Sequence, residues 1–222
     1  MEKIRRLRSG ELFWDRSAQY SGIIVHRVQR VPHTTATEPT MRTSTLLLTA
    51  FCMFSSTLGA AEPKPIELFN GKDLSGWGYK TGEKFDDKKE SDDKRFTAKD
   101  GILVVNPGTG IKQLWTTRKF PKDFELKLEF RAAVNADSGL FLRGPQLQVR
   151  DYLVAGPYKE LKKYKPQDWN EIVVIVKNNV AKCTCNGEVL EEALKLPETG
   201  GIGLEADRGQ MEYRNLRLTE VK

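Results

Sequence analysis

An alternation of apolar and polar residues with a period of two constrains this chain most. Phe124, Leu126, Leu128 and Phe130 alternate with charged residues along the segment 124–131. Successive side chains of a β-strand point to opposite faces, so this pattern predicts a strand with one buried face and one polar face.

Short segments of this kind recur along the chain between turn signals. Residues 172–176, IVVIV, are apolar at every position, which predicts a strand buried on both faces in the middle of a sandwich. Asn186-Gly187 predicts a type I′ hairpin turn between strands at 180–185 and 188–190. Residues 99–101, KDG, predict a further turn before a strand at 102–105.

These signals define the expected fold class. About ten short strands are expected, without a long amphipathic helix. The chain is therefore predicted to be all-β, an antiparallel β-sandwich or jelly roll. A βαβ nucleotide-binding fold is excluded because the crossover helices are missing.

Residues 41–61 have the layout of a secretory signal peptide. Arg42 supplies a short positive region, and residues 45–58 form a mostly apolar run that is too short to span a bilayer. Gly59 and Ala61 place small side chains before a cut ahead of Glu62. We therefore expect a secreted or periplasmic protein with no membrane contact beyond the cleaved signal. A buried apolar helix is the alternative.

The expected mature domain is 62–222. Residues 1–40 are not what normally precedes a signal peptide. Residues 1–40 are polar, rich in arginine and without sustained periodicity. We interpret them as a spurious or disordered extension, with translation starting at Met41.

The net charge of +6 lies mostly in the N-terminal segment, where residues 1–61 carry eight basic and four acidic residues. The remainder is nearly balanced, which argues against a nucleic-acid-binding surface. Both histidines, His26 and His33, also precede residue 62. The expected domain therefore has no Ser-His-Asp or Cys-His mechanism and no histidine-ligated zinc.

We expect no cofactor or metal site. The sequence contains no P-loop and no paired GxGxxG motif. Cys183 and Cys185 fall on one predicted strand and are interpreted as small buried thiols. Binding of a divalent ion is the alternative, because one segment is rich in aspartate: Asp86, Asp87, Asp92 and Asp93. The spacing of these residues is not that of a calcium loop.

The segment 152–168 is long for a connection in a compact domain. It carries Tyr158 among other tyrosines and several lysines. Such a loop is either a lid or binding loop for a sugar or an anion, or a solvated basic loop.

Nine stretches together resemble one known family in content and order. The chain is similar to the 3-keto-disaccharide hydrolase domain over nearly all of residues 66–220. The stretches are ELFNGKDLSGW (67–77), DGILVV (100–105), DFELKLEFR (123–131), DSGLFLRG (137–144), QLQVRD (146–151), DWNEI (168–172), CNGE (185–188), GGIGLEADRG (200–209) and YRNLRL (213–218).

The resemblance implies a concanavalin A-like jelly roll and the hydrolysis of glycosides oxidised to a ketone at C3. The ketone makes the C2 hydrogen acidic, so a base removes it, the enolate expels the C1 substituent, and water adds to the enone. Such a site needs a general base and a cation or hydrogen-bond donor for the enolate oxygen.

Strand parity selects the candidate residues, because polar side chains two residues apart share a face. We expect Arg143 to stabilise negative charge, Glu205 to act as the base and Gln148 to orient a hydroxyl; a structural ion pair is the alternative role for Arg143. The predicted catalytic residues are Arg143, Glu205, Asp207 and Asp151, and the predicted substrate-binding residues are Gln146, Gln148, Trp77 and Tyr158.

Departures from the family's pattern keep other functions open. Gln146 stands where the family has a glutamate, and Glu205 and Asp207 stand where it has a glutamine and a histidine. A neutral amide is no base, so a non-catalytic carbohydrate-binding module of the same fold is the first alternative. A structural or interaction domain of an envelope assembly is the second.

Overall fold

The computed structural model describes residues 63–221, which hold thirteen β-strands and no helix. The predictions for residues 1–40 and 41–61 lie outside this range. No helix of the described residues is long and apolar enough to cross a membrane.

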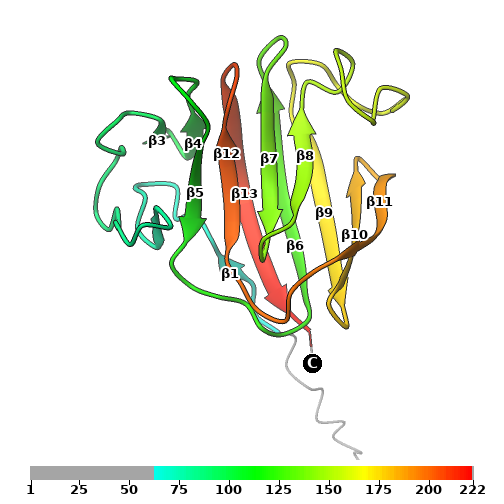
Figure 1. Ribbon diagram of the computed structural model, residues 1–222, viewed down its shortest axis with the longest axis horizontal. Coiled ribbons are helices and arrows are strands. Elements are labelled where there is room, and N and C mark those ends of the chain that lie inside the picture. The colour runs from blue at the N-terminus through cyan, green and yellow to red at the C-terminus, as the bar shows by residue number, and fades with distance from the viewer. Residues whose placement is uncertain (1–62, 222) are drawn as a thin grey trace, which may run out of the picture. The chain divides into compact units, whose positions relative to one another are not determined.

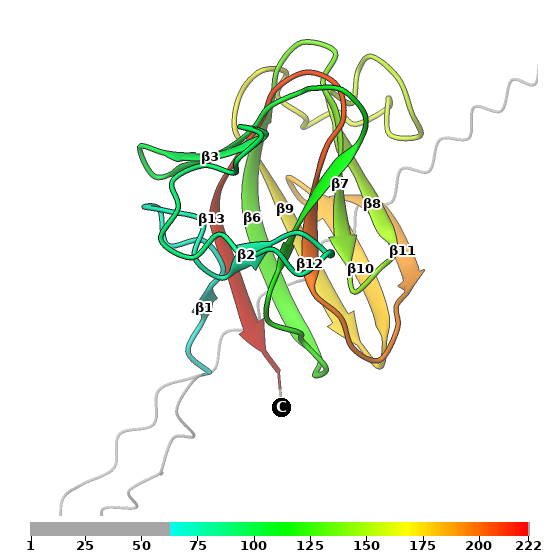
Figure 2. The same ribbon diagram turned by 60° about the vertical axis from the view of Figure 1, so that its left-hand side comes forward.

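The strands form two antiparallel sheets that lie face to face (Figures 1 and 2). The larger sheet has the order β11-β10-β9-β6-β13-β4-β3, and β1 pairs with β13. Its strands are β1 (Ile66–Glu67), β3 (Phe96–Lys99), β4 (Ile102–Val105), β6 (Phe124–Ala132), β9 (Asn170–Lys177), β10 (Val180–Cys185), β11 (Glu188–Lys195) and β13 (Met211–Glu220).

The smaller sheet has the order β2-β5-β12-β7-β8 and lies in front of the larger one in Figure 1. Its strands are β2 (Trp77–Gly78), β5 (Lys112–Thr116), β7 (Asp137–Leu142), β8 (Gln146–Arg150) and β12 (Ile202–Ala206). The all-β antiparallel sandwich expected from the sequence is therefore confirmed.

The core lies between the sheets and follows the alternation in the sequence. On β6, Phe124, Leu126, Leu128 and Phe130 are at most 1% exposed, as the period of two predicts. Each fully buried side chain of this size contributes roughly 1.5–3 kcal/mol of transfer free energy.

The predicted turns take the expected backbone conformations. Asn186 and Gly187 have φ angles of 47° and 80°, and β10 and β11 form the expected hairpin. Asp100 and Gly101 have φ angles of 52° and 78° between β3 and β4. Asn and Gly adopt positive φ at low cost, so these turns follow directly from the sequence.

The prediction for 172–176 is wrong in one respect. Ile172, Val174 and Val176 are buried in the core, but Ile175 is 48% exposed. The strand β9 lies in the larger sheet with one face open, because no further layer within residues 63–221 covers that face. A run of β-branched residues thus indicated a strand correctly but not its burial on both faces.

Candidate functional site

The outer face of the smaller sheet carries a set of polar and aromatic side chains. The inner-face residues of β12, Ile202, Leu204 and Ala206, are buried in the core, so Gly203 and Glu205 between them belong to the opposite face. The same alternation on the neighbouring strands completes this surface, which we call the outer face: Gln113, Trp115, Asp137, Gly139, Phe141, Gln146, Gln148, Arg150, Gly203 and Glu205.

Glycine at position 203 lets an aromatic ring lie flat on this sheet. Gly203 pairs with Trp115 of β5, and a Cβ at residue 203 would come within 2.9 Å of two ring atoms of the indole. The ring of Phe141 lies 5.3 Å from that of Trp115 on the other side of β12. Only glycine leaves room for the indole to cross β12.

A second glycine opens a path to Glu205. The side chain of Gln146 on β8 crosses β7 above Gly139, where a Cβ would lie 2.0 Å from its Nε2. Gln146 Nε2 thereby donates a hydrogen bond to Glu205 Oε2 at 2.8 Å. Gln113 pairs with Glu205 in the sheet register and bonds it from the side of β5. The carboxylate is held between two amides.

Burial raises the pKa of Glu205 above its ordinary value, and the negative charges of Asp207 and Asp137 act in the same direction. Hydrogen bonds from Gln113 and Gln146 oppose this shift because they favour the ionised form. Glu205 is 7% exposed, so the solvent screens its charge only weakly. A fixed carboxylate with a raised pKa is suited to accept a proton.

A charged cluster lies beside it around Asp137. Arg150 Nη1 and Arg208 Nη2 lie 3.1 Å and 3.5 Å from Asp137 Oδ2, and Gln148 Nε2 donates to the other oxygen. Arg150 is buried, and its Nε has no hydrogen-bond partner among the described residues. The outer face therefore combines one carboxylate base candidate with a buried guanidinium.

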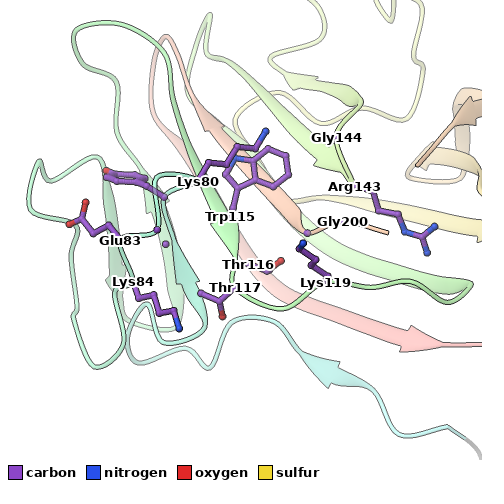
Figure 3. Close-up of a pocket in the computed structure, with 14 residues that line it drawn as sticks. Lys80, Glu83, Lys84, Trp115, Thr116, Thr117, Lys119, Arg143, Gly144 and Gly200 are labelled. Carbon is purple, nitrogen blue, oxygen red and sulfur yellow. The ribbon is translucent and has the colours of Figure 1, made fainter. Parts of the chain in front are cut away.

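A pocket of about 380 Å³ opens at the Trp115 end of this face (Figure 3). Glycine backbone forms much of its wall, and three lysines and one glutamate border it. The lining residues include Gly78, Lys80, Glu83, Lys84, Trp115, Thr116, Lys119, Arg143, Gly144, Gly200 and Gly201. Its volume falls in the range of about 300–1,000 Å³ that is usual for small-ligand sites.

Four of the eight predicted site residues share the outer-face side of the smaller sheet. Gln146, Gln148 and Glu205 lie on it. Asp207 follows β12 two residues after Glu205, and its negative charge raises the pKa of Glu205. These positions remain candidates for the roles assigned to them.

Arg143 does not converge with Glu205, which corrects the predicted grouping. Its backbone takes a φ of 57° after β7, so the side chain leaves the outer face. The guanidinium donates to Asn179 Oδ1 at 2.9 Å, to Pro197 O at 3.1 Å and to Lys122 O, and it lies 5.3 Å from the Phe124 ring. Figure 3 shows it turned away from Trp115. Arg143 borders the pocket at Trp115, but its guanidinium fastens loops and does not face Glu205.

Asp151 and Tyr158 also lie elsewhere. Asp151 is 3% exposed and accepts hydrogen bonds from the backbone of Asn135 and the side chains of Tyr164 and Gln167. Tyr158 packs on the buried ring of Tyr152 and donates to Glu191. Both residues anchor the 152–168 loop to the sandwich, so neither is placed to touch a ligand on the outer face.

Trp77 is a core residue and offers no platform. It is fully buried, and its indole Nε1 donates to Leu68 O at 2.7 Å. The register places Trp77 opposite Thr116 and Gly78 opposite Trp115, so β2 turns Trp77 inward. Trp115, which has the opposite parity, is the tryptophan of the site.

Gln113 and Asp137 are not among the site residues predicted from the sequence. Gln113 and Trp115 alternate with the buried Leu114 in KQLWT, and this short pattern was the available signal. Asp137 forms its ion pair with Arg150 on the neighbouring strand β8.

Three of the four aspartates at 86–93 have partners in the structure. Asp86 accepts from Gly76 N, Asp92 pairs with Lys88, and Asp93 binds Lys112 and the hydroxyls of Ser91 and Tyr79. Within residues 63–221, no group of three His, Cys, Asp or Glu is arranged to hold a metal ion.

The fold and this face define a class: an antiparallel two-sheet jelly roll with a polar and aromatic surface on its smaller sheet. A family model described as "3-keto-alpha-glucoside-1,2-lyase-like domain" matches residues 64–219. The chain belongs to this family, as its sequence stretches indicated.

Solved structures share the fold at low identity. Two are candidate glycosyl hydrolases of Parabacteroides distasonis. One has a TM-score of 0.57 and 17% identity, covering 71% of this chain and 94% of that one. The other has a TM-score of 0.54 and 19% identity, covering 71% and 100%. A carbohydrate-binding module, CBM66 of Bacillus subtilis, has a TM-score of 0.49 and 9% identity, covering 66% and 97%. No curated protein shows significant similarity.

Proposed function

We propose that this protein is a secreted or periplasmic carbohydrate-active enzyme that cleaves glycosides oxidised to a ketone at C3. The observation that carries the proposal is Glu205, a buried carboxylate held between Gln113 and Gln146 beside the indole ring of Trp115. Family membership supports the reaction class, because the family is described by a lyase of 3-keto glucosides.

In the proposed reaction Glu205 removes the proton from C2, and the electrons of that C–H bond form the enolate of the C3 ketone. The enolate re-forms the ketone and breaks the bond from C1 to the leaving oxygen, which takes a proton. Water then adds across the C1–C2 double bond, with its hydroxyl on C1 and a proton on C2. A lyase performs the first two steps, and the addition of water makes the net reaction a hydrolysis.

The other residues of the outer face are assigned by their position. Gln146 and Gln113 orient the carboxylate, and Trp115 receives a sugar ring. Arg150 takes over the role first given to Arg143, since it is the buried guanidinium of this face and stabilises the enolate electrostatically. Gln148 orders Asp137 beside it.

A non-catalytic carbohydrate-binding module is the second candidate. The hydrogen bonds that Glu205 already accepts favour it, since they occupy oxygens that a base needs free. It predicts saccharide binding without turnover.

The test is the fate of the C2 hydrogen. The protein is incubated with a chromogenic 3-keto-glucoside in deuterium oxide, and the sugar product is analysed by mass spectrometry and NMR. Deuterium at C2 together with aglycone release supports the proposal. Aglycone release with the original hydrogen retained at C2 contradicts the elimination, whereas release of an unsaturated product without any hydrogen at C2 shows that the reaction stops at the lyase stage. Saccharide binding without release supports the binding module.

The proposed location has its own test. Sequencing of the protein from its native host should give an N-terminus at Glu62. An intact N-terminus at or before Met41 on the secreted fraction would contradict cleavage of the signal.

A further inference from the structure

The pocket at Trp115 gathers more positive than negative charge. Lys80, Lys84 and Lys119 line it, and none of the three forms an ion pair within residues 63–221. Glu83 is the single acidic residue of the lining, and Figure 3 shows its carboxylate turned away from Trp115. Several ammonium groups around one concave surface raise the local potential and attract anions.

Two of these lysines point toward the platform. Lys80 Nζ lies 3.9 Å from the centroid of the Trp115 ring. Figure 3 shows Lys80 alongside Trp115 and the Lys119 ammonium on the side of Thr116, with Lys84 pointing away. Arg143 adds little, because its guanidinium is bound to carbonyl oxygens outside the pocket.

The two faces of the Trp115 indole are not equivalent. One face rests on Gly203, whose backbone leaves no space for a further atom. The other face is the one that Lys80 covers. A ring that stacks on Trp115 must therefore meet the Lys80 ammonium and replace its cation–π contact.

This arrangement discriminates between ligands. A neutral sugar that displaces Lys80 makes stacking contacts and hydrogen bonds, but it offers no charge partner to the displaced ammonium. A sugar with an acidic substituent gives the displaced ammonium a charge partner, and Lys119 lies close enough to the same pocket to supply a second. We propose that this pocket receives a saccharide unit bearing an acidic group, a carboxylate or a sulfate ester, paired with Lys80 and Lys119. The inference rests on the proposed function and names the substrate class.

The test compares probes that share a ring and differ in charge. Isothermal titration calorimetry of the whole protein uses methyl β-D-glucuronide, glucose 6-sulfate, methyl β-D-glucoside and acetate. At about 0.05 M salt the glucuronide or the sulfate should bind at least about ten-fold more tightly than the glucoside, and this advantage should shrink at about 0.5 M salt. Acetate separates a bare anion from an acidic sugar and should bind more weakly than either charged sugar.

Lysine variants locate the effect. Lys80→Gln and Lys119→Gln should each weaken binding of the charged sugar about two- to five-fold, the usual range for exposed ion pairs. Binding of the neutral glucoside should change less than about two-fold. Lys177→Gln is the matched control, an exposed lysine on β9 of the other sheet, and should leave all affinities unchanged.

The outcomes separate this inference from the proposed function. Tighter binding of the sulfate than of the glucuronide identifies a sulfate ester, and the reverse identifies a carboxylate; both support the inference. Equal affinities for charged and neutral sugars, with intact cleavage of a neutral 3-keto glycoside, overturn the inference alone. If acetate binds as tightly as the charged sugars, the pocket recognises a bare anion, and the proposal that its ligand is a saccharide is overturned. No saccharide binding and no cleavage overturn both.

Discussion

Gln146 Nε2 on β8 donates a hydrogen bond to Glu205 Oε2 on β12, 2.8 Å away, although β7 lies between these strands. The bond crosses β7 above Gly139, where a Cβ would lie 2.0 Å from the donor. Because Gly139 of β7 has no side chain, a residue of β8 can reach across β7 and bind a residue of β12. The central carboxylate is oriented by residues that are remote in the sequence.

Replacing Glu205 by glutamine tests its role as a base. Glu205→Gln keeps the shape and removes the proton acceptor, so turnover of a 3-keto glycoside should fall about 10²–10⁴-fold. Affinity for the sugar should change little, because a glutamine still fits between two amides. Aglycone release and calorimetry measure the two effects.

Glu192→Gln is the matched control, since Glu192 is an exposed residue of β11 that pairs with Lys182. It should leave turnover and affinity unchanged. Full activity of Glu205→Gln would remove Glu205 from the mechanism.

Gly139→Ala tests the path of Gln146. The new methyl group meets the flexible end of the glutamine, so Gln146 should swing away at a small cost in stability. Turnover should fall to the level of Gln146→Ala, and the double variant Gly139→Ala/Gln146→Ala should be no worse than either single one. Additive losses in this cycle would show that the two residues act separately. Thermal denaturation monitors the fold.

The pH profile should report the raised pKa of Glu205. Burial favours its protonated form, so the base is lost as the pH falls through a value above the 4.5 of an ordinary glutamate. The acidic limb of kcat/KM should therefore lie above that value. The same shift should lower stability as the pH rises through this range, because the folded state binds the proton more tightly than the unfolded state does. An acidic limb at or below 4.5 contradicts this environment.

Trp115 and Trp77 should respond oppositely to substitution. Trp115→Ala removes the platform and should weaken sugar binding about ten-fold. Trp77→Phe removes the buried hydrogen bond to Leu68 O, so it should lower the free energy of unfolding by about 1–3 kcal/mol and leave affinity unchanged. Calorimetric titration and denaturant unfolding distinguish the two residues. If Trp77→Phe lost affinity for the sugar at full stability, Trp77 would be a sugar-binding residue after all.

The thiols should be inert in the folded protein. Burial raises the pKa of both Cys183 and Cys185 to about 12, so little thiolate forms at neutral pH. Iodoacetamide should leave both unmodified in buffer and alkylate both in denaturant, as mass spectrometry would show. Rapid alkylation of either cysteine in buffer would contradict this burial.

The sequence predicted the fold well because strand alternation and turn residues are local. The parity of β6 and the positive φ angles of Asn186 and Asp100 needed no tertiary information. The nine family stretches added the expectation of a jelly roll. Both kinds of signal act over a few residues.

The site was harder to predict, since it depends on registers between strands. Parity correctly gave the shared face of Gln146, Gln148 and Glu205, but not the turn at Arg143 that redirects the guanidinium. The choice between Trp77 and Trp115 depended on which face of β2 and β5 meets the core. Residues that act through tertiary contacts alone, such as Gly139, leave no local signal.

The central claim is most directly tested by aglycone release from a chromogenic 3-keto-glucoside, with the unoxidised glucoside as the control substrate. The account predicts release from the keto substrate alone, and its loss in Glu205→Gln. Equal release from both substrates, or release from neither, would contradict it.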